Sequence, residues 1–398
     1  MSDTHRYASR VRSMAPSATV ATTALAADLV RQGRDVIPMS AGEPDFDTPD
    51  HIKQAGIRAI QDGQTKYTAP ASGLIELKEA IARKLDRENG LHYDPSQIVI
   101  TCGAKQVIFA AIVALVDPGD EVLLPAPLYV SYADQVKLMG GVPVIIPTEP
   151  DAFCLSPDQF RSALTPRSKL IIFNSPSNPT GGIYSRAQFQ ALAELIAEAG
   201  LFTITDEIYE HFIYGDEEHV SLAALHPGVA DRCLTVNGFS KTFAMTGWRV
   251  GYGAGPEEWM SHIAKVQSQE TTNTCTLSQH AAIAALEGPQ DSVGTMRAAF
   301  KLRRNAIADG LNELDRVTCP RPKGAFYVFP NVSGLFGNTI ADDVEFCRYL
   351  LEAAGVAAVP GTGFSAPGYV RFSYTLPDDR LSDAIDRIQT AVTAIQGS

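Results

Sequence analysis

Between residues 97 and 255, the chain alternates short apolar runs with segments whose apolar residues recur at helical spacing. The apolar runs read QIVIT, EVLLP, VPVII, KLIIF, FTIT, CLTVNGF and WRVGYGAG. They lack the apolar–polar alternation of strands with one solvated face, which indicates strands buried on both faces. After QIVIT, a helix is predicted because apolar residues recur at helical spacing, namely Val107, Ile108, Ala111, Ile112 and Leu115. The pattern therefore predicts an α/β fold in which a mostly parallel sheet is covered by helices on both faces.

The two ends of the chain predict a second, smaller α+β domain. Helices are predicted over residues 18–33, over residues 292–314 and in a segment that starts at Ala341. The runs FYVFP and VRFSY are predicted to be strands, and a final amphipathic helix follows them. A length of 398 residues is compatible with two domains. We expect an N-terminal arm and part of the small domain in residues 1–46, a large ligand-binding domain in 47–291, and a small C-terminal domain in 292–398.

Charge and cysteine content argue against several classes of function. The formal net charge is −12, whereas general binding to nucleic acid or to membranes needs an excess of Lys and Arg. The six cysteines are scattered without a CxxC pair, so we expect neither disulfides nor a metal site. The segment MSDTHRYASRVRSM has no apolar run, and no stretch is long enough to span a membrane. We therefore expect no signal peptide and a cytoplasmic location.

Several groups that can bind a ligand lie close to the ends of the predicted strands. In chain order they are the helix start at Gly103 and the side chains of Asn178, Asp206, Tyr209, Lys241 and Arg249. The carboxyl ends of parallel strands meet at one edge of a sheet, and ligands bind beyond that edge. We therefore expect these groups to surround one ligand.

The cationic groups of this set suit a ligand that carries both an aldehyde and a phosphate. Lys241 is expected to form an imine with the aldehyde, because a poorly solvated, cationic site lowers the pKa of an amine and makes it nucleophilic. Arg249 offers a planar fork to the phosphate. The helix that begins at Gly103 offers free backbone N–H groups to the same phosphate.

The other groups of the set suit an aromatic ring with a basic nitrogen and a hydroxyl. Asp206 is expected to pair with the protonated ring nitrogen, and Tyr209 and Asn178 are expected to hydrogen-bond the ring hydroxyl. A phosphate, an aldehyde and such a ring occur together in pyridoxal 5'-phosphate, whose electron-withdrawing ring is tuned by contacts of this kind. We therefore expect this cofactor.

Seven ordered motifs give the chain a resemblance that covers nearly its whole length, from Pro16 to Arg371. They are SAGEPDFDTP, TKYT, GAKQ, NSPSNPTGG, TDEIYEHFIY, SKTFAMTGWRVGY and KGAFYVFP. The chain resembles the fold-type I pyridoxal-phosphate aminotransferases, in the bacterial aspartate aminotransferase branch of class I. The resemblance identifies Lys241 as the catalytic, Schiff-base lysine and Arg249 as the phosphate arginine.

The resemblance also implies how a substrate is held. Arg371 matches the arginine that binds the substrate α-carboxylate, a task that suits the guanidinium fork. Gly42 matches a backbone contact to the substrate, and Asn178 matches an asparagine that contacts both cofactor and substrate. Lys105, in GAKQ, matches the lysine that this branch uses for the distal carboxylate of acidic substrates.

Further cofactor contacts follow from the same resemblance. Ala104, Lys105 and Ser240 adjoin the expected phosphate and lysine positions and are assigned to cofactor binding. Tyr67, in TKYT, matches a tyrosine that reaches the phosphate of the partner subunit. The resemblance therefore implies a homodimer with shared active sites.

The chain departs from the pattern of this branch at three places. Tyr129 stands where a Trp commonly stacks on the cofactor ring, so we expect Tyr129 to contact both cofactor and substrate and to reshape the wall of the pocket. Gly238 replaces a Ser or Thr that contacts the phosphate in many relatives, which predicts one hydroxyl contact fewer. The sequence 272–274, TNT, replaces a common SNP that lies near the neighbouring subunit's substrate pocket.

The resemblance predicts an aminotransferase that works by a ping-pong cycle, with aspartate, glutamate and 2-oxoglutarate as default substrates. Two alternatives use the same cofactor motifs: an aromatic or prephenate aminotransferase, and a lyase on the same scaffold. A further alternative is the aminotransferase-like sensor module of a transcription regulator. That module needs an appended basic DNA-binding domain, and the N-terminal segment shows no helix-turn-helix pattern.

Overall fold

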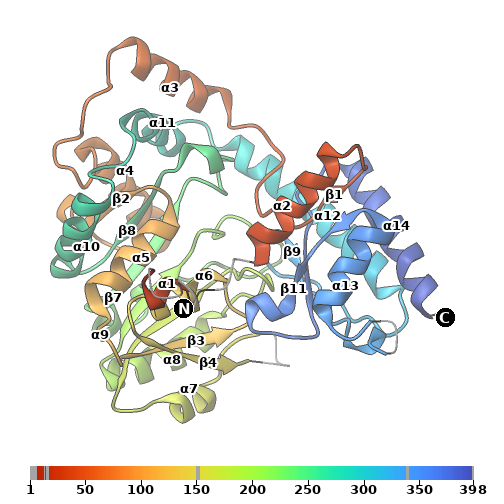
Figure 1. Cartoon of the computed structure of the whole chain (residues 1–398). Coiled ribbons are helices and arrows are strands. Elements are labelled where there is room, and N and C mark those ends of the chain that lie inside the picture. Colours follow the sequence, from red (N-terminus) through yellow and green to blue (C-terminus); the bar gives the residue numbers. More distant parts are fainter. Residues whose placement is uncertain (1–6, 13, 15–17, 149–152, 338–339, 397–398) are drawn as a thin grey trace.

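The computed structural model describes residues 7–12, 14, 18–148, 153–337 and 340–396. Part of the predicted N-terminal arm, including Pro16 at the start of the motif-bearing region, lies outside the described residues. Helices and strands alternate through most of the chain (Figure 1). None of the described helices is long and apolar enough to cross a membrane.

The central sheet has seven strands in the order β2-β8-β7-β6-β5-β3-β4. The strands are β2 (Ile98–Thr101), β3 (Glu121–Ala126), β4 (Val142–Pro147), β5 (Ser168–Asn174), β6 (Phe202–Asp206), β7 (Cys233–Gly238) and β8 (Gly251–Ala254). Only β8 among them is antiparallel to its neighbours, β7 and β2, so the other six strands all run in one direction. The predicted mostly parallel sheet is confirmed, although the last strand begins at Gly251 and not at Trp248.

Both faces of the sheet are buried, which explains why the strand sequences do not alternate. In β5, Leu170 and Ile172 belong to one apolar core, whereas Ile171 and Phe173 belong to another. The first core is closed by α5 (Ala104–Leu115), α6 (Ser131–Leu138) and α10 (Glu257–Glu270). The second is closed by α3 (Asp50–Gln61), α4 (Ile75–Lys84), α7 (Pro157–Ala163), α8 (Arg186–Ala199), α9 (Pro227–Ala230) and α11 (Thr276–Glu287). Helices therefore cover both faces, as predicted.

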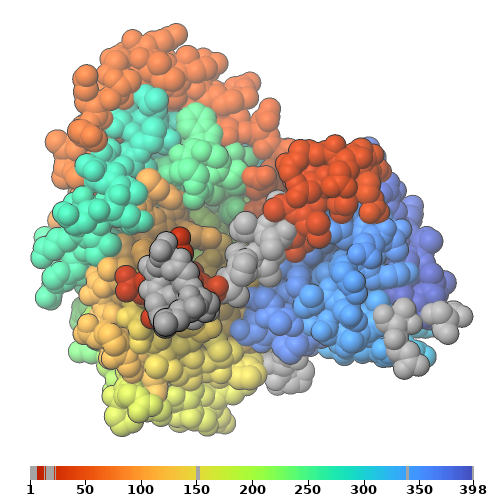
Figure 2. Space-filling model, in the orientation of Figure 1, coloured from red at the N-terminus to blue at the C-terminus, as the bar shows by residue number. Residues whose placement is uncertain are grey.

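A smaller α+β unit joins the two ends of the chain. Strand β1 (Ile37–Pro38) pairs in parallel with β10 (Val356–Ala357), and β12 (Val370–Ser373) lies antiparallel between β11 (Val359–Pro360) and β9 (Tyr327–Val328). The helices of this unit are α2 (Ala18–Arg31), α12 (Asp291–Asn312), α13 (Asp343–Tyr349) and α14 (Asp378–Gln396), and α1 (Ser9–Arg12) precedes them. In the space-filling view, the orange-red segment around α2 lies against the blue C-terminal part (Figure 2).

The predicted second domain of mixed N- and C-terminal origin is thus confirmed as a fold feature, whereas the boundaries 1–46, 47–291 and 292–398 stay a prediction. The helix expected from Ala341 begins at Asp343, where Asp342 caps it by accepting a hydrogen bond from the Glu345 amide at 2.8 Å. The helix predicted over 18–33 ends at Arg31 and is followed by a turn.

The strand directions decide which loops meet. The six parallel strands end at the same edge of the sheet, so the segments after β2, β5, β6 and β7 lie at that edge. Strand β8 runs the opposite way, so the residues that precede it, including Arg249, lie at the same edge. The reversal of one strand therefore brings Arg249 beside the carboxyl ends of the others.

Candidate active site

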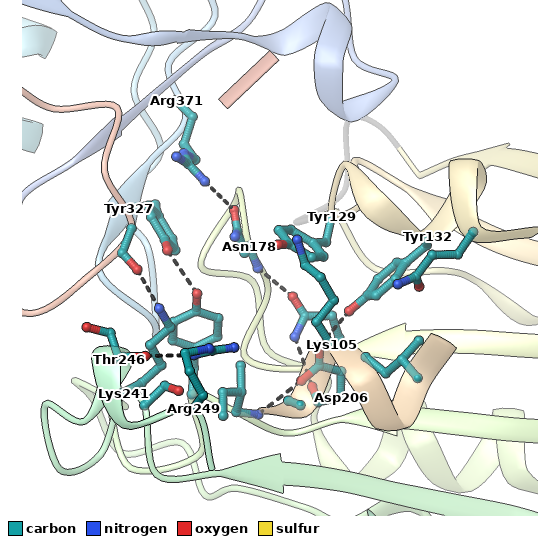
Figure 3. Close-up of a pocket in the computed structure, with 18 residues that line it drawn as sticks. Lys105, Tyr129, Tyr132, Asn178, Asp206, Lys241, Thr246, Arg249, Tyr327 and Arg371 are labelled. Carbon is teal, nitrogen blue, oxygen red and sulfur yellow. Dashed lines mark hydrogen bonds between the residues drawn. The ribbon is translucent and has the colours of Figure 1, made fainter. Parts of the chain in front are cut away.

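A cavity of about 310 Å³ opens at this edge of the sheet, next to the smaller unit (Figure 3). All predicted site residues except Gly103 and Tyr67 line it: Gly42, Ala104, Lys105, Tyr129, Asn178, Asp206, Tyr209, Ser240, Lys241, Arg249 and Arg371. A volume near 300 Å³ is typical of sites for small ligands. Four cationic side chains and one carboxylate face the cavity, in a chain with a formal net charge of −12. The cavity therefore favours anionic ligands.

Lys241 lies in the turn after β7 and points into the cavity. Its Nζ atom donates a hydrogen bond to the carbonyl oxygen of Gly42. Burial lowers the pKa of Lys241 to about 8; the cations Arg371 and Arg249 act in the same direction, against Glu43 and, more weakly, Asp206. A lysine with such a pKa has an appreciable neutral fraction near neutral pH, so its amine can act as a nucleophile or as a base.

Asp206 is the last residue of β6 and is only 6% exposed. Its Oδ2 atom accepts a hydrogen bond from the Tyr132 hydroxyl at 2.7 Å, and its Oδ1 atom accepts one from the Ile208 amide at 3.3 Å. Burial raises the pKa of Asp206 to about 6, although both hydrogen bonds oppose the rise. A buried carboxylate of this kind is stabilised by a cation placed next to it, so the site suits a protonated nitrogen.

Arg249 and the start of α5 form one wall of the cavity. The Nη1 atom of Arg249 donates to the Thr246 carbonyl oxygen at 2.7 Å, and Nη2 donates to the Cys102 carbonyl oxygen at 3.3 Å. Gly103 has φ = 84°, and a Cβ atom there would collide with the Arg249 guanidinium, so only glycine fits. Ala104 starts α5, whose first amides have no acceptor within the helix. A guanidinium beside a helix N-terminus can hold a phosphate.

Arg371, on β12, forms the opposite wall and is 1% exposed. Its Nη1 atom donates to Asn178 Oδ1 at 3.0 Å, and its Nη2 atom donates to the Ser40 carbonyl oxygen at 2.6 Å. Its guanidinium stacks over the Tyr327 ring at 4.5 Å and near the Phe364 ring at 5.1 Å. Its Nε atom is buried without a hydrogen-bond acceptor among the described residues. A buried guanidinium with an unused donor suits a bound carboxylate.

Seven residues that line the cavity were not predicted as site residues: Ile108, Tyr132, Gln135, Asn174, Ile208, Thr246 and Tyr327. Tyr132 lies in the first turn of α6, three residues after Tyr129, and neither a strand end nor a quoted motif marked it in the sequence. Tyr327 belongs to the quoted motif KGAFYVFP, and its hydroxyl lies 2.8 Å from the Tyr209 hydroxyl. Burial raises the pKa values of both phenols, so they act as neutral hydrogen-bonding groups.

Lys105 and Tyr129 lie together at the mouth of the cavity. The Nζ atom of Lys105 is 5.3 Å from the centre of the Tyr129 ring, and Tyr129 packs edge-on against Tyr132 at 5.5 Å. Figure 3 shows the Lys105 side chain extending beside Tyr129 toward the cavity. The amine is therefore placed to meet an anionic group of a ligand in the cavity.

Two of the residues considered from sequence lie away from the cavity. The Tyr67 side chain is 81% exposed, and Ile57 and Ile60 of the preceding helix are exposed as well. The predicted contact of Tyr67 with a partner subunit stays a prediction. Gly238 is not among the described residues that line the cavity, and a Cβ atom there would lie 3.1 Å from the Cα atom of Gly251.

A buried ionic cluster lies behind the segment that carries Asp206 and Tyr209. The Lys84 ammonium pairs with the Glu210 carboxylate, which also accepts a hydrogen bond from Asn237 at 2.7 Å. His219 Nε2 lies 2.8 Å from Glu207 Oε2. Burial would lower the pKa of His219, but the carboxylates of Glu207 and Glu210 together outweigh burial and raise it. Glu207, Glu210 and His219 are close enough to share a cation, yet the ammonium of Lys84 already occupies one carboxylate. The expectation of no metal site stays a prediction.

Comparison with known proteins gives a consistent result over nearly the whole chain. The sequence model of the family described as "Aminotransferase class I and II" matches residues 34–388. A protein of Cereibacter sphaeroides named aspartate/prephenate aminotransferase is 49% identical over 94% of this chain and 95% of its own length. A Geobacillus stearothermophilus protein named aspartate aminotransferase is 46% identical over 98% of this chain and 99% of its own length.

Solved structures match equally well. The Rhizobium meliloti aspartate aminotransferase superposes with a TM-score of 0.93 at 43% identity, over 98% of this chain and 99% of that one. The Thermus thermophilus aspartate aminotransferase with maleate superposes with a TM-score of 0.92 at 44% identity, over 97% of this chain and 99% of that one. The architecture derived above is therefore the architecture of these enzymes.

Proposed function

This chain belongs to the class I and II aminotransferase family and is an aminotransferase, and from this premise we propose that it uses pyridoxal 5'-phosphate to move an amino group between aspartate or glutamate and a 2-oxo acid. The observation that carries the proposal is the cavity in which Lys241, Asp206 and Arg249 face one another below the guanidinium of Arg371. The acidic substrates expected from the sequence agree with the names of the relatives, and the ping-pong cycle stays a prediction.

The residues present fit pyridoxal 5'-phosphate group by group. Arg249 and the amides at Ala104 suit its phosphate. Gly103 has no side chain, so the space beside the Arg249 guanidinium stays open. Asp206 suits the ring nitrogen, because a cation there relieves the burial of the carboxylate. Tyr209 and Asn178 offer hydrogen bonds to a ring hydroxyl.

Lys241 carries out the proton transfers in the proposed reaction. When bound, the cofactor supplies an aldehyde and an electron-withdrawing ring that stabilises negative charge at the substrate Cα. Lys241 takes the Cα proton as a general base, which its pKa of about 8 permits near neutral pH. Arg371 binds the substrate α-carboxylate and so orients the Cα–H bond toward Lys241. Tyr129 and Gly42 line the same space, where they would contact the substrate.

Lys105 supports the choice of an acidic substrate. Its exposed side chain lines the cavity, and its ammonium lies 5.3 Å from the centre of the Tyr129 ring. A second carboxylate on the substrate would neutralise it, while Arg371 holds the first. The Thermus thermophilus relative was solved with maleate, a compound with two carboxylates.

The proposal is tested by two measurements. Purified protein loaded with pyridoxal 5'-phosphate is mixed with single amino acids, and conversion to the amine form of the cofactor is followed by absorbance. Lys105→Ala should lower the specificity constant for aspartate and glutamate roughly ten- to a hundredfold, because a charge-assisted hydrogen bond contributes about 1.5–3 kcal/mol. Alanine and phenylalanine, which lack the second carboxylate, should change little. An equal loss for all four amino acids contradicts this role of Lys105.

Prephenate is the second candidate substrate. The Cereibacter sphaeroides relative, 49% identical, carries aspartate/prephenate in its name. Tyr129, which replaces a Trp of this branch, forms part of the wall that a cyclic substrate would meet. Assays of aspartate with prephenate and with 2-oxoglutarate as amino acceptors distinguish a dual-specificity enzyme from one restricted to acidic substrates. If the protein is instead a lyase, the same assays should show release of ammonia or of a side-chain fragment.

We also propose a homodimer with shared sites. Tyr67 is 81% exposed on its own chain, and Ile57, Ile60 and Ile75 are exposed on the neighbouring helices, so this surface offers apolar side chains to a partner. A cytoplasmic location stays a prediction.

A further inference from the structure

The segment of residues 42–48 lies against the turn that carries Lys241 and Arg249. Its first carbonyl, that of Gly42, accepts the hydrogen bond of the Lys241 amine. At its other end, the Thr48 hydroxyl donates to the Ala244 carbonyl oxygen at 2.7 Å and accepts from Trp248 Nε1 at 3.1 Å. These contacts join residues that are far apart in the chain; Lys241 and Gly42, for example, are separated by 199 positions.

Glu43 makes the central contact between the two segments. Its Oε2 atom accepts a hydrogen bond from the Thr246 hydroxyl at 2.8 Å. The carbonyl oxygen of Thr246 in turn accepts the hydrogen bond of Arg249 Nη1 at 2.7 Å. Glu43 is not among the described residues that line the cavity, whereas Thr246 is. Glu43 is therefore linked to the cavity through Thr246 and through the adjacent Gly42.

The charge of Glu43 also acts on Lys241. Besides Glu43, the titratable or charged residues around the Lys241 amine are Lys105, Tyr129, Tyr132, Asp206, Tyr209, Arg249, Tyr327 and Arg371. Burial, Arg371 and Arg249 lower the pKa of Lys241; of the carboxylates that oppose them, Glu43 has a larger influence than Asp206. The acid that most favours the ammonium form of Lys241 thus lies outside the cavity.

We propose that Glu43 is a positioning residue for the aminotransferase reaction: by accepting the hydrogen bond of the Thr246 hydroxyl, it holds the turn that presents Arg249. The inference rests on the proposed function for its biological meaning. The physical claim concerns the protein alone, so it can be measured without turnover.

Two substitutions of Glu43 separate charge from hydrogen bonding. Glu43→Gln removes the charge but keeps an oxygen acceptor for Thr246, and Glu43→Ala removes both. Because Glu43 is exposed, water screens its charge, and we expect Glu43→Gln to lower the titration midpoint of Lys241 by about 0.2–0.7 pH units. Asp47→Asn, which removes an exposed carboxylate from the same segment, is the matched control and should leave the midpoint unchanged.

The charge is tested on cofactor-free protein. The rate at which an acylating reagent modifies Lys241 is measured against pH by mass spectrometry of the peptide that contains it. A midpoint in Glu43→Gln within 0.1 pH unit of wild type, or an equal shift in Asp47→Asn, overturns the electrostatic role.

The positioning role is tested by binding of inorganic phosphate to the cofactor-free protein. Glu43→Gln should bind phosphate at least as tightly as wild type, because it keeps the acceptor for Thr246. Glu43→Ala should bind about two- to tenfold more weakly than Glu43→Gln, the effect of one lost hydrogen bond. Equal affinities of the two variants overturn the positioning role. A protein that fails to transaminate but shows these shifts would refute the proposed function and leave the role of Glu43 intact.

Discussion

Replacing Asp206 with asparagine should stabilise the cofactor-free protein above pH 6, although the same change should weaken the cofactor-bound enzyme. Asp206 is 6% exposed, and burial raises the pKa of its carboxyl from 3.8 to about 6. The folded protein therefore binds this proton more tightly than the unfolded chain does. The favourable contribution is complete below pH 4 and is lost as the pH rises through about 6.

The magnitude follows from the size of the shift. A rise of about two pKa units corresponds to about 3 kcal/mol of lost stability once the carboxyl is ionised in both states. Asparagine has no charge to bury but provides one oxygen for the two donors, Tyr132 and Ile208, so about 1 kcal/mol of hydrogen bonding is lost. The expected gain in the free energy of unfolding is therefore about 1–2 kcal/mol above pH 6, and it should disappear toward pH 4.

The assay is urea denaturation of cofactor-free wild type and Asp206→Asn at several pH values between 4.5 and 8. The difference between the two proteins should grow with pH over this range. Adding pyridoxal 5'-phosphate should stabilise wild type more than the variant, because only the carboxylate can pair with a protonated ring. Asp47→Asn, an exposed acid, serves as control. A variant that is less stable than wild type at pH 8 without cofactor, or a difference that does not depend on pH, would refute the reasoning.

Three further predictions concern the lysines and the subunit contact. Lys241→Ala should still bind pyridoxal 5'-phosphate but complete no transamination, and borohydride should no longer attach the cofactor to the protein; wild-type turnover would remove Lys241 from its role. Mixing inactive Lys241→Ala chains with inactive Tyr67→Ala chains should restore activity, because one site of each mixed dimer holds both native residues; a lack of recovery would contradict shared sites. Lys84→Met should lower the free energy of unfolding by about 3 kcal/mol, since it leaves the buried Glu210 carboxylate without its cation. The control Lys53→Met, in an exposed pair, should lower it by less than about 1 kcal/mol, and equal losses would count against the buried pair.

The sequence by itself determined the class of fold and most of the residues of the site. Uninterrupted apolar runs such as KLIIF required strands with both faces covered, and the structure places Leu170 and Ile171 in different cores. Polar residues after strand ends could be assigned to one edge, because parallel strands end together. Such inferences succeed where the physical cause is local, as with the periodicity of a helix or the direction of neighbouring strands. The family resemblance then added Arg371 and Gly42, which lie far from the sheet in sequence.

Only the tertiary structure decided which neighbours each site residue contacts and how far its pKa is shifted. Three contacts of the site join segments that are far apart in the chain. The Tyr132 hydroxyl donates to Asp206, the Arg371 guanidinium stacks on the Tyr327 ring, and the Thr246 hydroxyl donates to Glu43. The reversed direction of β8, which brings Arg249 to the shared edge, likewise depends on pairing with β2 and β7. Local sequence patterns report which face of an element is apolar. Burial, and with it the pKa values of Lys241 and Asp206, arises only when distant elements pack together and exclude water.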